Sequence, residues 1–183
     1  VCLGDSIDRL LRARGFEVVA ANYLGDVGAH IAKCLWFYLD ELDDEGRQAP
    51  ETARGEWLGR IYMQATLKLE DLEAAAKADE SDEAAASALA GARARMTEIL
   101  QKLEGKDPEI LKIWDETRQW SLDDFDEIYA WADVHFDRVF YESEVDEPGL
   151  KLVEEYLQKG VFIESQGAVG IENPEIKHMP FFM

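Results

Sequence analysis

The chain changes from one structural pattern to another and back, and this change limits its fold more than any other feature. Residues 16–24 (FEVVAANYL) form a compact run of β-branched and aromatic residues of strand length, ending at a glycine-containing turn, residues 25–28. A helical pattern precedes this run over residues 5–14, and another begins at Ala29. Helix, strand, glycine turn and helix in this order predict a layered α/β fold with a parallel sheet.

Both helices of this first segment carry local signals. Asp5 or Ser6 suits the start of the first helix, and Gly15 suits its end. The second helix has a single apolar stripe, formed by Ile31, Cys34, Leu35, Tyr38, Leu39 and Leu42. Such a stripe predicts that one face of the helix packs against a core.

Strand patterns disappear in the middle of the chain. Residues 52–103 are alanine-rich and charged, and the spacing of their apolar residues predicts helices around 57–69 and 84–103. Pro108 suits the first turn of the next helix. Residues 121–124 (SLDD) resemble a capping box, which predicts that a separate helix begins there and continues to Trp131.

Strand patterns return after Asp133. Residues 134–141 (VHFDRVFY) predict a strand, residues 148–159 a helix that ends at Gly160, and residues 161–172 further strands with a turn near Gln166. The chain is therefore divided into α/β sequence, a helical insertion and α/β sequence again. The predicted bounds are 1–50, 51–132 and 133–183.

Charge narrows the range of partners. The chain has 39 acidic and 19 basic side chains, a net charge of −20. Because nucleic-acid affinity depends largely on neutralised phosphates, this balance argues against autonomous binding to DNA or RNA. Half of the excess lies in residues 115–147, which hold 12 acidic and 2 basic residues, and residues 70–83 form a second acidic cluster. Solvated helix faces explain these clusters best, a salt-adapted surface is the alternative, and a calcium loop lacks the necessary ligand spacing.

Several other classes of protein do not fit the sequence. The longest unbroken apolar run, residues 34–39, is far shorter than a membrane span, and no cationic and then apolar segment opens the chain. Cys2 and Cys34 do not make a disulfide framework, so we expect a reduced cytoplasmic protein. The histidines do not have zinc-ligand spacing; they are His30, His135 and His178. The tryptophans are expected in the core; they are Trp36, Trp57, Trp114, Trp120 and Trp131.

Three blocks in the correct order resemble the arginyl-tRNA synthetases, class I ligases that attach arginine to tRNA. The first is Gly4-Asp5-Ser6 followed by RLLRARGFEV and ANYLGDVGAHIAK (residues 4–33). The second is residues 111–114, SLDDFDEIY (121–129) and especially FDRVFYESEV (136–145), and the third is LVEEYLQKGVFIESQGAV (152–169). Any one block alone is a weak signal, and together they span most of the chain in the right order. His30 is a departure, since many members carry glutamine there. The resemblance implies that the α/β part is Rossmann-like and nucleotide-binding.

The resemblance also assigns candidate site residues. Those that would flank the pocket for ATP and arginine are Asn22, Gly25, Asp26, Gly28, His30 and Glu142. Glycines after a strand let a ligand approach the backbone, although this turn also suits a simple tight connection. The Glu142 carboxylate would hold the cationic substrate in a bidentate pair, although a surface acid is the alternative. ATP with Mg²⁺, arginine and tRNA are the expected ligands of the parent enzyme.

The HxGH and KMSKS-type motifs of this family, and its Tyr…Asp segment that selects arginine, do not occur in the 183 residues. We therefore expect an internal fragment of the catalytic domain that does not activate arginine alone, because catalysis by positioning needs the whole set of groups. The alternatives are a stand-alone, non-catalytic paralogue that acts as a binding or regulatory module, and a helical domain with a fold-level likeness only. Incomplete sheets expose strand edges, so self-association is also expected.

Overall fold

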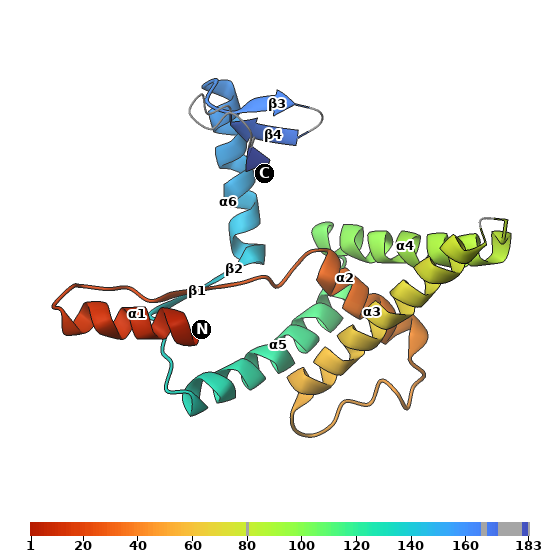
Figure 1. Cartoon of the computed structure of the whole chain (residues 1–183), viewed down its shortest axis with the longest axis horizontal. Helices are drawn as coiled ribbons and strands as arrows, with labels where there is room; N and C mark the ends of the chain where they lie inside the picture. Colours follow the sequence, from red (N-terminus) through yellow and green to blue (C-terminus); the bar gives the residue numbers. More distant parts are fainter. Residues whose placement is uncertain (80, 166–167, 172–180, 183) are drawn as a thin grey trace.

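The computed structural model describes residues 1–79, 81–165, 168–171 and 181–182. Helices α2 to α5 form a body from which α1 and α6 extend in different directions (Figure 1). The elements are α1 (Cys2–Ala13), β1 (Ala21–Leu24), α2 (Ala29–Trp36), η1 (Phe37–Glu41), α3 (Arg54–Ala78), α4 (Glu83–Glu104), α5 (Pro108–Trp131), β2 (Arg138–Tyr141), α6 (Glu142–Gln158), β3 (Ile163–Ser165), β4 (Ala168–Ile171) and β5 (Phe181–Phe182). The described residues are thus mainly helical, with a small parallel sheet and a second, antiparallel one.

The parallel sheet joins the two ends of the predicted insertion. β1 pairs with β2 in parallel, and the register places Ala21 opposite Arg138 and Leu24 opposite Tyr141. Both strands therefore end at the same edge, which the α/β pattern of the sequence requires. β3 pairs with β4 and β4 with β5, both antiparallel. The turn predicted near Gln166 lies outside the described residues.

The core lies within the helical body. Its buried cluster consists of Ala32, Leu35, Trp36, Ala92, Ile99, Leu103 and Ile110. These side chains come from α2, α4 and α5, while α3 buries Ile61 and Ala65. α2 therefore packs with the helices of the insertion although it lies before residue 51. This packing fixes the start of α2, and with it the glycine turn, on the helical body.

One predicted helix boundary is wrong. α5 runs without a break from Pro108 to Trp131, so no helix begins at residues 121–124. Ser121 lies inside the helix, where its Oγ donates to the carbonyl of Thr117 at 3.5 Å and does not cap a helix start. The nearby carboxylate of Asp124 caps a different helix, α3, instead. The start of α5 is as predicted, with Pro108 in its first turn and Asp107 as the capping residue.

Other boundaries differ by a few residues. Of the predicted strands 16–24 and 134–141, all of them described, only residues 21–24 and 138–141 form a paired strand, because pairing, and not composition, limits a strand. α1 begins at Cys2 without a side-chain cap, and α6 begins at Glu142, with Pro148 inside it. Gly15 and Gly160 follow the ends of α1 and α6 as predicted, with φ of 86° and 69°.

The predicted core role of tryptophan holds for two residues and is wrong for a third. Trp36 and Trp120 are buried, whereas Trp131 is 87% exposed. Trp131 is the last residue of α5, beyond the part of that helix that meets the start of α3. No helix among the described residues has the length and apolar character needed to span a membrane.

Candidate functional site

The candidate site lies where the two parallel strands end. β1 runs into the turn of residues 25–28 and then into α2, and β2 runs directly into α6, which begins at Glu142. The first N–H groups of a helix have no partner within the helix, so two helix starts at one edge favour polar or anionic groups. In α/β sheets, ligands bind outside the carboxyl ends of the strands.

Four of the predicted residues lie at this edge, and three of them, Gly25, His30 and Glu142, lie close to one another. A Cβ placed on Gly25 would lie 3.2 Å from Oε2 of Glu142 and 3.9 Å from Cε1 of His30. Nε2 of His30 also lies 3.2 Å from the carbonyl oxygen of Gly25. The missing side chain of Gly25 therefore lets the Glu142 carboxylate approach the turn closely. Glu142 is half-buried and His30 is exposed.

Gly28 is required for a different reason. Its φ is 104°, a backbone conformation that side-chain-bearing residues rarely adopt, and it precedes the first residue of α2. Among the described residues, a Cβ there would meet only the imidazole ring of His30, with Nδ1 at 3.6 Å and Cε1 at 3.7 Å, which are ordinary contact distances. Backbone geometry therefore explains this glycine, and close packing does not.

Asp26 lies beneath the edge and is 7% exposed. Its Oδ2 accepts hydrogen bonds from Nε of Arg118 at 2.8 Å and from Oγ of Ser143 at 2.7 Å, and its Oδ1 accepts the N–H of Ser143 at 2.9 Å. Its backbone carbonyl accepts Nε1–H of Trp114 at 2.7 Å. Both carboxylate oxygens are thus engaged by the protein itself, and the charge is compensated by Arg118.

Asn22 is separated from the other predicted residues. Its Nδ2 donates to the hydroxyl of Tyr129 at 3.3 Å. It lines a cavity of about 340 Å³ together with residues of α5 and of the segment before β2, among them Phe125 and Val134. The structure therefore brings Gly25, Gly28, His30 and Glu142 to one edge, places Asp26 beneath it and directs Asn22 into a neighbouring cavity.

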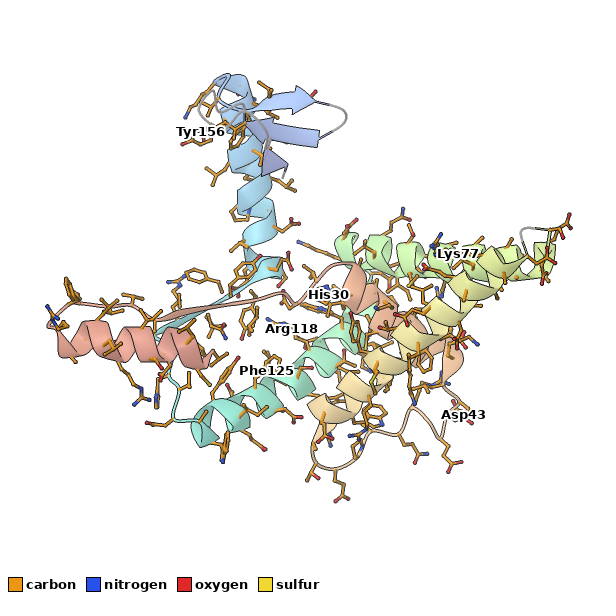
Figure 2. All side chains as sticks on the ribbon, in the orientation of Figure 1. His30, Asp43, Lys77, Arg118, Phe125 and Tyr156 are labelled. Atoms are coloured by element: carbon orange, nitrogen blue, oxygen red, sulfur yellow. The ribbon has the colours of Figure 1, made fainter. Side chains whose placement is uncertain are left out.

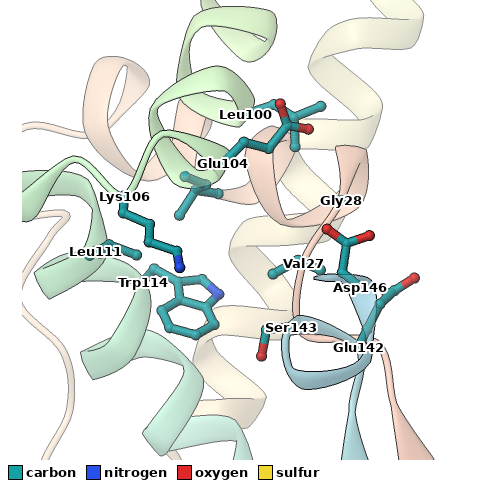
Figure 3. Close-up of a pocket in the computed structure, with 11 residues that line it drawn as sticks. Val27, Gly28, Leu100, Glu104, Lys106, Leu111, Trp114, Glu142, Ser143 and Asp146 are labelled. Carbon is teal, nitrogen blue, oxygen red and sulfur yellow. The ribbon is translucent and has the colours of Figure 1, made fainter. Parts of the chain in front are cut away.

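A larger cavity, of about 520 Å³, opens beside the edge (Figure 3). One wall comes from the turn and α6, with Gly28, Glu142 and Asp146. The facing wall comes from the junction of α4 and α5, with Lys106 and Trp114. An indole face and several carboxylates suit a cationic group that also has an apolar part.

The sequence analysis missed three residues of this region: Tyr23, Arg118 and Ser143. Tyr23 is partly removed from water, and this desolvation, followed by the charges of Glu142 and Asp26, raises the pKa of its hydroxyl. Arg118, labelled on α5 in Figure 2, is one of only two basic residues in the acidic segment 115–147, and that isolation is the signal that marks it. Ser143 directly follows the predicted Glu142.

Residues 1–180 match the protein family described as tRNA synthetases class I (R), catalytic domain. The chain belongs to this family. The family accounts for the order of the three blocks and for the parallel pairing of strands on either side of a long helical segment.

Curated relatives agree with this assignment. The arginine–tRNA ligase of Bdellovibrio bacteriovorus is 42% identical over 170 residues, which are 93% of this chain and 27% of that protein. The arginine–tRNA ligase of Porphyromonas gingivalis strain W83 is 31% identical over 172 residues, 91% of this chain and 28% of that protein. The chain therefore spans little more than a quarter of the length of these relatives.

A solved structure supports the fold. The crystal structure of the arginyl-tRNA synthetase from Plasmodium falciparum matches with a TM-score of 0.62 and 17% sequence identity. The match covers 98% of this chain and 26% of that one. The arrangement of helices and strands is thus that of a segment of an arginyl-tRNA synthetase.

Proposed function

We propose that this chain forms part of the catalytic domain of an arginine–tRNA ligase, which makes arginyl-adenylate from ATP and arginine and then transfers arginine to tRNA. The observation that carries the proposal is the position of the Glu142 carboxylate, held against Gly25 at the carboxyl edge of the parallel strands. A family of this activity needs an acidic group at the pocket for its cationic amino acid.

In this proposal Glu142 binds the guanidinium group of arginine. A carboxylate accepts two parallel hydrogen bonds from a guanidinium, which gives both strength and orientation. Asp146 lies one turn further along α6 and lines the same cavity, so it adds negative charge behind Glu142. His30 borders the same turn, with Nε2 3.2 Å from the carbonyl oxygen of Gly25.

ATP is proposed to bind at the turn and at the start of α2. The N-terminal N–H groups of α2 suit an anionic group, and Gly28 at the start of that helix has no side chain to block its approach, whereas the Glu142 carboxylate takes the side-chain space of Gly25. Mg²⁺ would be bound mainly through the ATP phosphates, which are its usual ligands in nucleotide sites. Asp26 supports the turn from below, and Asn22 supports the strand from the neighbouring cavity.

The same proposal assigns the parts of the chain to the domains of the enzyme. Residues 1–50 and 133–183 would belong to a Rossmann-like nucleotide-binding domain of a cytoplasmic enzyme, and residues 51–132 would be its insertion. The 183 residues alone are proposed to be inactive, since they hold neither an HxGH nor a KMSKS-type motif. Among the described residues β1 and β2 pair only with each other, and the resulting open edges favour self-association of the isolated chain.

A hybrid enzyme tests the proposal. The matching segment of the Bdellovibrio arginine–tRNA ligase is replaced by this chain, and tRNA charging and arginine-dependent ATP–pyrophosphate exchange are measured. We expect activity in the hybrid and none in the isolated 183 residues. Glu142→Gln should raise the KM for arginine by about thirtyfold, the loss of a charged hydrogen bond. Glu127→Gln, an exposed acid on α5, is the matched control and should change nothing.

Two outcomes would contradict the proposal. An inactive but folded hybrid would favour a stand-alone, non-catalytic paralogue. Equal effects of Glu142→Gln and Glu127→Gln on arginine binding would remove Glu142 from the arginine pocket.

A further inference from the structure

We propose that Arg118 is a positioning residue for the Glu142 carboxylate, acting from the helical insertion through Asp26, Ser143 and Tyr141. The inference rests on the proposed role of Glu142 in arginine binding. It extends the site to a residue of α5 that lies outside both strands and both helix starts.

The first link is the pair of Arg118 and Asp26. Nε of Arg118 lies 2.8 Å from Oδ2 of Asp26, and the two side chains are 19% and 6% exposed. A carboxylate this deeply buried is costly unless it is paired, and Arg118 supplies the partner of opposite charge. A lysine would supply the charge but not the planar fork of the guanidinium.

The second link runs from Asp26 to the residue after Glu142. Oδ1 of Asp26 accepts the N–H of Ser143 and Oδ2 accepts its hydroxyl, at 2.9 Å and 2.7 Å. Two hydrogen bonds from one residue to one carboxylate fix the backbone at the first turn of α6. An anionic acceptor is also favoured at a helix N-terminus.

The third link reaches the residue before Glu142. The guanidinium of Arg118 lies 4.1 Å from the ring centroid of Tyr141 and 5.2 Å from that of Trp114. Both distances are within the range of cation–π attraction. Arg118 thus contacts Tyr141 directly and holds Ser143 through Asp26, so the backbone of Glu142 is restrained on both sides.

The consequence concerns where the carboxylate of Glu142 lies. Its Oε2 approaches Gly25, which directly precedes Asp26 in the chain. The same network therefore fixes the turn and the start of α6 relative to each other. A shift of about 1 Å in a binding group is enough to weaken a geometrically demanding contact strongly.

The test uses the hybrid enzyme with Arg118→Met, Arg118→Lys and Ser143→Ala. We expect Arg118→Met to raise the KM for arginine about tenfold and the KM for ATP by less, because the network restrains Glu142 on both sides but reaches the turn only through Asp26. Arg118→Lys should recover part of the loss, and Ser143→Ala combined with Arg118→Met should be less than additive. Arg60→Met, which removes an exposed arginine paired with Glu56 on α3, is the matched control and should leave both constants unchanged.

The outcomes separate the two proposals. If Arg118→Met only lowers thermal stability, or raises both KM values equally, Arg118 has no positioning role. If the unsubstituted hybrid is inactive, the proposed function fails, and amide hydrogen exchange in the 183-residue chain decides the positioning role. Exchange at Ser143 should then be about tenfold faster in Arg118→Met than in Arg60→Met, and equal rates would overturn the inference.

Discussion

The carboxylate of Asp124, on α5, accepts the backbone N–H of Glu56 at 2.8 Å and so caps the first turn of α3. The residue before this helix, Ala53, has a left-handed φ of 54°, and no side chain from its own position caps the helix. Gly55 makes room for the carboxylate, because a Cβ there would lie 2.8 Å from Oδ2 of Asp124. The cap therefore comes from a helix far away in sequence.

This cap predicts a measurable loss of stability. Asp124→Ala should lower the free energy of unfolding by about 1 kcal/mol, the usual effect of losing a capping carboxylate. Asp126→Ala, an exposed acid on the same helix, should change it by less than about 0.5 kcal/mol. Urea unfolding followed by circular dichroism at 222 nm gives both values. Equal values for the two variants would show that the cap does not contribute.

A double variant examines the same contact from the other side. Gly55→Ala should also be destabilising, because its Cβ would displace the carboxylate of Asp124. Once Asp124 is already alanine, the added methyl group has nothing to displace. The combined loss should therefore be smaller than the sum of the two single losses.

Helices and glycine signals were largely predictable from sequence. The periodic apolar residues of α3 and α4, Pro108 at the start of α5, and Gly15 and Gly160 after helix ends all depend on local geometry, which the sequence carries. The capping-box prediction at Ser121 failed for the opposite reason. Asp124 of this motif caps α3, a helix distant in sequence, and no local sequence pattern indicates a long-range contact of this kind.

The site was predictable only in part. Gly25, Gly28, His30 and Glu142 were selected by resemblance and meet at one edge. Arg118 and Ser143, which hold Asp26, were not selected, because Arg118 belongs to the helical insertion and reaches Asp26 only through the packing of α5 against the turn. A candidate binding residue is distinguished from a supporting residue by its surroundings in the folded chain. The hydrogen bonds of Asp26 and the separate cavity that Asn22 lines provide that distinction here.

The helical core should respond strongly to truncation. Ile99 is fully buried, and Ile99→Ala should lower the free energy of unfolding by about 2–5 kcal/mol through lost burial and a residual cavity. Leu67 is 54% exposed on α3, and Leu67→Ala should cost less than about 0.5 kcal/mol. Tryptophan fluorescence follows this unfolding, since Trp36 belongs to the same cluster. Similar losses of unfolding free energy in Ile99→Ala and Leu67→Ala would contradict the position of Ile99 in the core.

Replacing the two glycines of the turn by alanine should have different effects, on stability for Gly28 and on the KM for arginine for Gly25. Gly28→Ala should destabilise the chain by about 1–2 kcal/mol, because alanine is strained at a φ of 104°. Gly25 is outside that backbone region, so Gly25→Ala should change stability by less than about 0.5 kcal/mol. In the hybrid enzyme it should instead raise the KM for arginine, since its Cβ would press on Glu142. A stable Gly28→Ala variant would contradict the described turn.

The two cysteines should differ in reactivity toward a thiol reagent. Cys34 is buried, and desolvation raises its pKa to about 11. At pH 8 only about one part in a thousand is then thiolate, the reactive form. Cys2 is exposed, so the native chain should show one rapidly reacting thiol, which Cys2→Ser removes and Cys34→Ser leaves. A rapid phase that persists in Cys2→Ser would contradict the burial of Cys34.

The same burial predicts a dependence of stability on pH. Because the pKa of Cys34 is raised, the folded chain keeps a proton that the unfolded chain releases near pH 9.0. The unfolded state therefore binds fewer protons above that pH, and the free energy of unfolding should fall as pH rises from about 9 toward 11. Cys34→Ser lacks this titration, so its stability should fall less over the same interval. Parallel curves for the two proteins would show that Cys34 does not titrate differently on folding.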